Sequence, residues 1–294
     1  MKRMKQAIFR AIPALLLLLL GCAGASAQTD EIQVYDAEIA APGVFNLMVH
    51  NNFTPEGLKT PRFPGGLVPN QTLNGVPEWA YGVTDWFEQG LYLPLYSVAN
   101  GQGPVFDGFK LRELFVVPHA AERTFFYGVN FEFSYNARHW DQNRSTSEIR
   151  PIIGWHFGQF DFIVNPILDN SWLGFNRLDF APTARVAYNI SKTWAVAAEV
   201  YSDYGEIKQF LPFEQQSQQL FGVVDYKSED FNIEAGIGFG LTPASDRLVV
   251  KLMVSRDLYK PPAKMSETHV PLQGPKLSLG SDALSALRLP DFGN

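Results

Sequence analysis

Cysteine is almost missing from this sequence. Cys22 is the one cysteine among 294 residues, and it lies in an amino-terminal region with the pattern of a cleaved secretion signal. The region combines an apolar run, Ala11 to Leu20, with small residues at Ala25-Ser26-Ala27. Its basic residues are Lys2, Arg3, Lys5 and Arg10. We therefore expect a signal peptide at residues 1–27 and a mature chain that begins at Gln28.

Cleavage at that point leaves the mature chain without any thiol. Disulfides, thiolate metal sites and cysteine nucleophiles are then excluded. The alternative is a lipoprotein signal, in which Leu19-Leu20-Gly21-Cys22 would place a lipid-bearing cysteine at the new terminus. Leucine beside the glycine fits that signal poorly, so we favour cleavage after Ala27.

Long apolar runs and an excess of positive charge are also missing. The run from Ala11 to Leu20 is shorter than the roughly 20 residues that a membrane-spanning helix needs. A formal net charge of −6 provides no basic face for phosphates, so nucleic acid is not expected as a partner. Long amphipathic helical periods are likewise missing from the middle of the chain.

Apolar and polar residues alternate along most of the mature sequence. In Phe125 to Asn136, six aromatic or aliphatic residues at odd positions oppose Gly128, Asn130, Glu132 and other residues at even positions. Phe231 to Leu241 and Leu178 to Ile190 repeat this pattern. One face therefore suits lipid and the other suits water, which is typical of a transmembrane β-strand.

Twelve such segments follow one another, and their connections are alternately short and long. The expected strands are 43–53, 76–84, 87–98, 108–118, 124–136, 147–157, 160–169, 178–190, 194–204, 217–227, 231–241 and 247–258. Short turns at one end and long loops at the other are typical of single-chain bacterial outer-membrane barrels. We predict an all-β fold, a transmembrane antiparallel up-and-down β-barrel of about 12 strands. A soluble β-sandwich or lipocalin-like barrel is the alternative.

No Pro/Gly/Ser linker divides the chain, so we expect one domain with short flanking regions. The barrel is predicted at 43–259, after a periplasmic amino-terminal segment at 28–42. Residues 260–294 carry five prolines among polar residues and are predicted to be a mostly disordered periplasmic tail.

Two hairpin sequences resemble those of a known family. Tyr81 to Leu91, with its Tyr-Gly-Val-Thr-Asp turn, and Ala187 to Val196 are similar to hairpins of the MetA-pathway phenol-degradation family of outer-membrane barrels. The resemblance covers about a tenth of the chain and implies a barrel fold. It also implies transport of small aromatic or hydrophobic compounds, an analogy of function rather than a property of these residues. The tail that follows Leu258-Tyr259 departs from barrels that finish on an aromatic residue.

Strand parity assigns a mixed but mainly acidic set of side chains to the barrel interior. The predicted lumen-lining residues are Glu78, Lys110, Arg112, Glu132, Glu148, Arg150, His156, Asp161, Asp179, Arg185, Glu199, Asp225, Glu234 and Lys251. One interpretation is a web of cross-strand ion pairs that fills a narrow barrel. The other is a weakly cation-preferring pore. Glu113 breaks the parity of its strand, which predicts a bulge near Lys110 to Leu114.

Three prolines lie at similar heights on consecutive strands, in the half of the wall nearer the long loops. Pro151, Pro166 and Pro182 cannot donate ladder hydrogen bonds, and unpaired backbone groups are costly in lipid. We hypothesise a lateral opening there, through which a hydrophobic ligand reaches the outer leaflet. The alternative is a set of simple bulges that shape the wall.

Catalytic residues are not predicted, although two histidine clusters suggest the alternative of a lipid-modifying enzyme. These clusters are His50 with Asn51 and Asn52, and His139 with Asp141, Ser145 and Ser147. Neither has a recognisable nucleophile and base pattern, and no metal or cofactor motif appears. The expected function is a channel or transporter for small solutes, with a structural barrel as a further alternative. Expected partners are outer-membrane lipid, lipopolysaccharide, the barrel-assembly machinery and an unknown small solute.

Overall fold

The computed structural model describes residues 31–99, 101 and 103–261 of the chain. The predicted signal peptide at 1–27, including Cys22, and the tail from residue 262 lie outside the described residues. The described part is nearly all β-strand, with three single-turn helices: η1 (Ala120–Glu122), η2 (Phe175–Arg177) and η3 (Phe213–Gln215). None of the helices in this part is long and apolar enough to cross a membrane.

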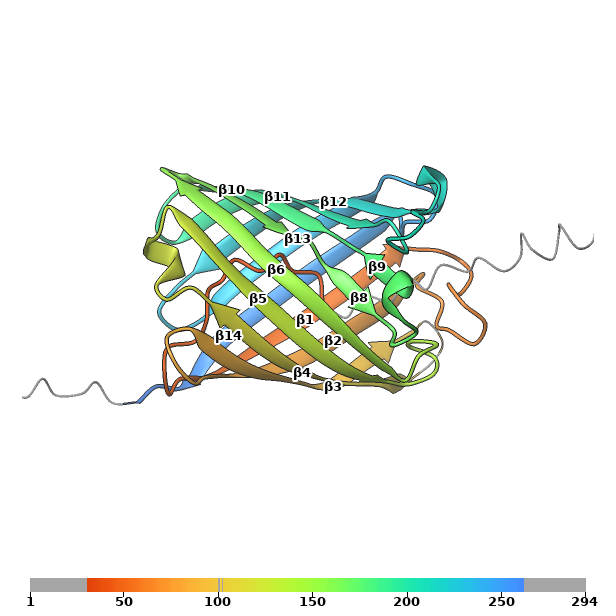
Figure 1. The fold of residues 1–294 in the computed structure, drawn as a ribbon, viewed down its shortest axis with the longest axis horizontal. Coiled ribbons are helices and arrows are strands. Elements are labelled where there is room, and N and C mark those ends of the chain that lie inside the picture. The colour runs from red at the N-terminus through yellow and green to blue at the C-terminus, as the bar shows by residue number, and fades with distance from the viewer. Residues whose placement is uncertain (1–30, 100, 102, 262–294) are drawn as a thin grey trace, which may run out of the picture. The chain divides into compact units, whose positions relative to one another are not determined.

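Fourteen strand segments form one closed antiparallel sheet (Figure 1). Two wall strands are interrupted, one between β7 and β8 and the other between β9 and β10, so the wall has twelve strands. The segments are β1 (Phe45–Glu56), β2 (Thr72–Gly82), β3 (Phe87–Val98), β4 (Pro104–Val116), β5 (Phe125–Asn136), β6 (Ser145–Phe157), β7 (Phe160–Asn165), β8 (Leu168–Asn170), β9 (Leu178–Phe180), β10 (Thr183–Asn189), β11 (Trp194–Asp203), β12 (Ser217–Lys227), β13 (Asn232–Gly240) and β14 (Leu248–Tyr259). The predicted fold class is confirmed.

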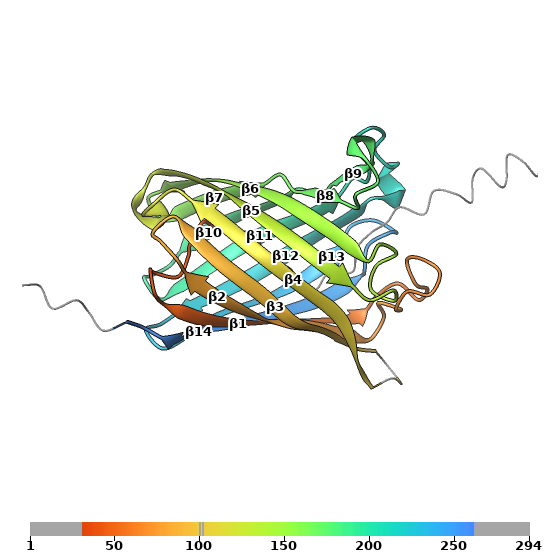
Figure 2. The same cartoon turned by 60° about the horizontal axis from the view of Figure 1, so that its bottom comes forward.

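Closure comes from pairing of the first and last strands. β1 and β14 are antiparallel partners from Phe45 opposite Tyr259 to Glu56 opposite Leu248, and β5 pairs with β6 on the other side of the wall. The strands run obliquely around the barrel (Figure 2). One end of the barrel carries the short connections and is called the turn end; the other carries the long connections and is called the loop end.

Side chains alternate across the wall as the sequence predicted. Phe126 in β5 is fully buried, whereas its neighbour Tyr127 is 55% exposed on the outside. The same alternation continues along β5 to Asn136 and recurs along β12 and β13. The wall therefore presents an apolar surface outward and encloses polar groups.

A bulge predicted near Lys110 to Leu114 is found at the edge of that range. Pairing of β4 with β5 is regular from Gly108 to Val116, whereas the pairing of β4 with β3 shifts register between Lys110 and Gly108 and again between Gly108 and Phe106. Glu113 lies on the outer face, where it accepts a hydrogen bond of 3.0 Å from the Gln89 amide on β3. The outward charge is thus satisfied by a polar neighbour on the same face, without a break in the ladder.

Two inward glycines make room for inward aromatic rings. A Cβ built on Gly154 would lie 2.0 Å from the Phe126 ring, and one on Gly238 would lie 2.2 Å from the Phe221 ring. Both rings are buried inside the barrel. Glycine at these positions lets a phenylalanine on the neighbouring strand fill the interior.

Gly238→Ala is expected to destabilise the folded barrel by about 1–3 kcal/mol, because the added methyl group overpacks the space of the Phe221 ring. Gly222→Ala is the matched control, since nothing lies within 4 Å of a Cβ at that position. Urea unfolding of both variants in detergent measures the difference. Equal unfolding midpoints for the two variants would contradict this account of the interior.

Candidate functional site

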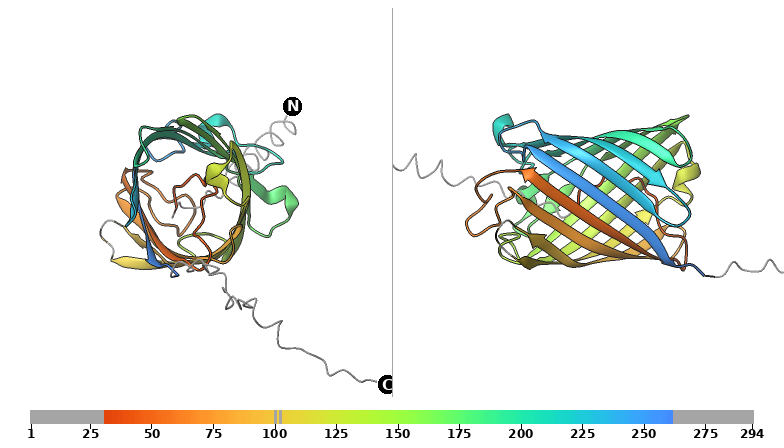
Figure 3. Two further views of the ribbon diagram at one scale, coloured as in Figure 1. Left: turned by 90° about the vertical axis from the view of Figure 1, so that its left-hand side faces the viewer. Right: turned by 180° about the vertical axis from the view of Figure 1, so that it is seen from behind.

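The amino-terminal segment, residues 31–40, lies inside the barrel. The view along the barrel axis shows this red segment within the ring of strands (Figure 3). It forms neither helix nor strand, and it leads to Gly43 and then to β1 at the turn end. Sequence analysis assigned residues 28–42 to the periplasm, and the structure instead encloses most of them. Alternation of apolar and polar residues predicts the two faces of a wall strand. It does not predict where an irregular segment lies.

Asn165 fixes the backbone of this segment to the wall. Its side-chain carbonyl accepts a 2.7 Å hydrogen bond from Tyr35 N–H, and its amide donates to the Tyr35 carbonyl at 3.1 Å. Asn165 is the last residue of β7 and is fully buried. A side-chain amide here takes the place of a neighbouring strand, so both polar groups of Tyr35 are satisfied.

The Tyr35 side chain brings two groups of wall residues together. The Arg150 guanidinium lies 4.4 Å from the centroid of the Tyr35 ring, which is a cation–π contact. The Tyr35 hydroxyl is 2.7 Å from the Tyr92 hydroxyl and 3.4 Å from Glu132 Oε1. Apolar contacts add to this, because Val34, Tyr35 and Ala37 belong to a buried cluster with Phe126 and other inward side chains.

One charge cluster surrounds Arg112 on the inner face of the wall. Arg112 pairs with Glu78 at 2.6 Å and also with Glu88, while His50 Nε2 lies 3.0 Å from Glu78. Lys110, on the same strand, pairs with Glu132 at 3.2 Å. These side chains are almost fully buried, so their pairing offsets the cost of taking charges out of water.

A second charge cluster surrounds Arg185 and Lys251. Arg185 pairs with Glu199, Asp225 and Glu234 on three neighbouring strands. Lys251 lies 2.5 Å from both Glu199 and Glu234, and its Nζ donates to the Ile32 carbonyl at 3.1 Å. The cluster therefore joins the wall to the amino-terminal segment.

The structure places the predicted lumen residues in these clusters and in the spaces beside them. Glu148 pairs with Arg150 at 2.6 Å, His156 lies 2.6 Å from Asp161, and Asp179 lines a cavity near the loop end. The prediction did not include Glu31, Tyr35, Glu88, Tyr92 and Asn165. The parity of strand 87–98 points Glu88 and Tyr92 inward and was a usable signal, but no pattern in the sequence indicates that Glu31 and Tyr35 enter the lumen.

Inward side chains are tightly packed at mid-height of the barrel. Tyr92, Glu199 and Lys251 each have 0% exposure, and Glu132 has 1%, although all four face inward. The wall clusters and the amino-terminal segment together fill the interior at this level.

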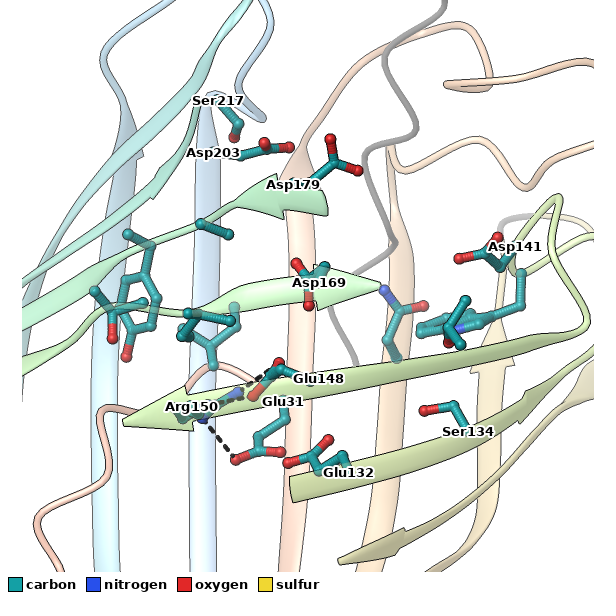
Figure 4. Close-up of a pocket in the computed structure, with 18 of the residues that line it drawn as sticks. Glu31, Glu132, Ser134, Asp141, Glu148, Arg150, Asp169, Asp179, Asp203 and Ser217 are labelled. Carbon is teal, nitrogen blue, oxygen red and sulfur yellow. Dashed lines mark hydrogen bonds and ion pairs between the residues drawn. The ribbon is translucent and has the colours of Figure 1, made fainter. Parts of the chain in front are cut away.

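An acid-lined cavity of about 240 Å³ lies above this level, at the loop end (Figure 4). Its floor is formed by Glu31, Ile32 and Gln33 of the amino-terminal segment. Its acidic residues are Glu31, Glu132, Asp141, Glu148, Asp169, Asp179, Asp203 and Asp246, and its basic residues are Arg62, Lys110 and Arg150. Burial raises the pKa of Asp141, which lies in the loop between β5 and β6, although a hydrogen bond from Asn143 N–H opposes that shift.

The ladder of backbone hydrogen bonds in the wall is interrupted near Pro151, Pro166 and Pro182. β6 pairs with β8 up to Ile149 opposite Leu168, and with β7 only from Ile153 opposite Val164. Pro151 and Pro166 lie in this interval, and Pro182 lies in the matching interval between β9 and β10. The second interval keeps backbone hydrogen bonds on both sides: Ala181 N–H donates to the Ile167 carbonyl at 3.1 Å, and the Pro182 carbonyl accepts from Ser202 N–H at 3.1 Å.

Neither histidine cluster forms a catalytic pair. His139 lies 2.8 Å from Asp107, and Ser97 donates to the other oxygen of the same carboxylate, so the aspartate separates the serine from the histidine. Nucleophilic catalysis needs direct contact between nucleophile and base. Within the described part of the chain, no group of three or more His, Cys, Asp or Glu side chains could hold a metal ion.

Lys251→Met is expected to lower the free energy of unfolding by about 3–5 kcal/mol, because it leaves the buried carboxylates of Glu199 and Glu234 without this cation. Lys260→Met is the control. Lys260 forms an exposed pair with Asp257 at 3.2 Å, and loss of such a pair costs about 1 kcal/mol or less. Urea unfolding in detergent distinguishes the two. A small effect at Lys251 would show that the second charge cluster contributes little to the stability of the barrel.

Comparison with known proteins supports the fold. No model of a protein family matches the chain, and no curated protein matches it. Among solved structures, an outer-membrane channel of the COG4313 group from Pseudomonas putida F1 has a TM-score of 0.52 at 12% identity, over 77% of this chain and 99% of that one. The NanC porin has a TM-score of 0.48 at 7% identity, over 73% of this chain and 100% of that one.

The fold therefore defines a class: a closed, twelve-stranded antiparallel β-barrel of the type found in outer-membrane channels. Membership of the MetA-pathway family, suggested by two hairpins, is not confirmed by a family match. The likeness to the Pseudomonas putida channel is one of fold alone, because the sequences share few identical residues.

Proposed function

We propose that this protein is a bacterial outer-membrane channel for small solutes, closed by its own amino-terminal segment. The wall supports the location, since large apolar side chains such as Tyr127, Phe133 and Phe239 are exposed on its outer face. Aromatic side chains pack outside the turn end, including Trp194 with Tyr226 at 4.8 Å. Such bands suit a membrane interface.

The enclosed amino-terminal segment is the observation that carries the proposal. A purely structural barrel can fill its interior with wall side chains alone. Here part of the filling is an irregular segment that is held by side-chain contacts and not by a strand ladder, among them contacts with Asn165, Arg150, Lys251 and Glu88. Within the described residues the segment joins the wall at the turn end, through Gly43 and β1, so its displacement leaves the ladder of the wall intact.

A channel also explains the cavity better than an enzyme does. The cavity lies at the loop end, where a solute arrives from outside the cell, and its floor is the amino-terminal segment itself. Three described histidines contact carboxylates: His50 contacts Glu78, His139 contacts Asp107 and His156 contacts Asp161. Displacement of the segment would connect the cavity with the turn end.

Asn165→Ala, combined with Tyr35→Ala, is expected to raise single-channel conductance in planar bilayers. The double variant removes the side-chain hydrogen bonds from Asn165 to the Tyr35 backbone, and it also removes the aromatic side chain that fills the lumen. Asn189→Ala is the control, since Asn189 donates to Asp161 near the turn end and does not contact the segment in the described structure. An unchanged conductance of a folded double variant would contradict closure by the segment.

A lateral route for hydrophobic or aromatic solutes is a second proposal, favoured by the ladder gap at Pro151, Pro166 and Pro182. The hairpin from β8 to β9 follows this gap and extends outside the ring in the axial view (Figure 3). Its tip exposes Trp172, Leu173 and Phe175, the last with 89% exposure. Outer-leaflet lipid and lipopolysaccharide are the partners that suit these side chains. The barrel-assembly machinery is a further proposed partner, as expected for an outer-membrane barrel.

Replacement of all three prolines by threonine restores ladder donors and is expected to reduce uptake of hydrophobic solutes. Pro77→Thr is a control, because Pro77 also lies in a strand but outside the gap. Uptake into proteoliposomes is compared for a hydrophobic and a polar solute of equal size. Unchanged uptake of every hydrophobic solute by the folded triple variant would remove the lateral route and leave the axial channel untouched.

A further inference from the structure

The basic side chains of the loop-end cavity are already engaged by part of its acidic set. Lys110 pairs with Glu132, Arg150 with Glu148 and Glu31, and Arg62 with Asp246. Each of these cations therefore has a carboxylate beside it. Asp141, Asp169, Asp179 and Asp203 add four further carboxyl groups to the same lining.

Three of the carboxylates meet on one side of the cavity. Asp169 on β8 and Asp179 on β9 are directly opposite each other in the ladder, and Asp203 ends β11 (Figure 4). Like charges directly opposite each other on a sheet destabilise it. The pair at Asp169 and Asp179 thus costs folding free energy when both are ionised, unless a proton or another positive charge lies between or beside the two groups.

Two residues that line the same cavity each have a buried side-chain oxygen that makes no hydrogen bond within the described structure. They are Glu31 Oε2, on the amino-terminal segment, and Thr183 Oγ1, at the start of β10. Glu31 is 7% exposed and Thr183 is 6% exposed. A buried oxygen without a donor is costly, so each is a position where a bound group with N–H donors would gain a partner.

The remaining lining restricts the kind of ligand. The carboxylates are spread over several elements and do not converge closely enough to hold a metal ion within the described residues. Between them lie apolar side chains, among them Ile32, Trp140, Ile167 and Val249. A molecule with separated ammonium groups and methylene units between them matches both features.

We propose that the loop-end cavity is a binding site for a small organic polycation of the diamine or polyamine class. This inference rests on the proposed function only for the passage of the ligand through the barrel; the binding site itself is argued from the residues that line the cavity. The ammonium groups lie against Asp169, Asp179 and Asp203 and against Glu31 on the floor, while the methylene groups contact the apolar lining. Because Glu31 belongs to the segment that closes the lumen, an occupied site contacts the closing element directly.

The test uses the full mature protein in detergent, titrated with spermidine by isothermal titration calorimetry. Asp169→Asn/Asp179→Asn/Asp203→Asn is expected to weaken spermidine binding at least about tenfold, because it removes three charges that face the ligand. This variant relieves the repulsion between Asp169 and Asp179, so it is expected to fold. Asp85→Asn/Glu229→Gln/Asp230→Asn removes the same charge from exposed turns and is the matched control.

Two neutral or compact probes complete the design. 1,4-Butanediol has a methylene chain without charge, and Mg²⁺ has charge without a chain; both are expected to bind more weakly than spermidine. Absence of saturable spermidine binding, or equal binding by the triple variant and the wild type, would overturn the proposed site. Binding of Mg²⁺ as tight as that of spermidine would also overturn it, in favour of general charge attraction.

Bilayer recordings separate this inference from the proposed function. If the wild type conducts K⁺ but spermidine neither binds nor blocks the current, the binding site is wrong and the channel stands. If the wild type never conducts but binds spermidine through the three aspartates, the site stands and the channel is wrong.

Discussion

Backbone pairing in a setting without water is the constraint on which the rest of this structure depends. A wall strand that faces lipid has no solvent to satisfy its N–H and C=O groups, so every strand needs two neighbours and the sheet has to close. Pairing of β1 with β14 meets this requirement and removes both sheet edges. It also separates an interior from an exterior, and this separation produces the alternation of side chains along the strands.

Burial of many charged side chains in the interior then costs free energy, because these charges lose contact with water. Arg112, Arg185 and Lys251 are nearly buried, and such ions are tolerated only with counter-charges in direct contact. The two clusters around these residues therefore account for most of the predicted lumen residues. They favour the interpretation as an ion-pair web at mid-height, whereas the acid-lined cavity at the loop end retains the character expected of a cation-preferring pore.

The fold could be predicted closely because alternation with a period of two is a local property of each strand. The predicted strand 87–98 coincides with β3, and 217–227 coincides with β12. Parity predicted an irregular stretch of β4 near Lys110 but not its cause, because the outward Glu113 carboxylate accepts a hydrogen bond from Gln89 on the next strand and does not itself break the ladder. The route of residues 31–40 could not be predicted, since it depends on contacts with Asn165 and Lys251, which are more than a hundred residues away in sequence. The sequence therefore identified individual charges, but not the segment that links them.

The contact between Lys251 and the Ile32 carbonyl has a consequence for the order of assembly. Ile32 precedes the first strand, whereas Lys251 lies on the last one, so the two meet only after the whole wall sequence between them is available. A chain that lacks β14 therefore has no partner at this position for the Ile32 carbonyl.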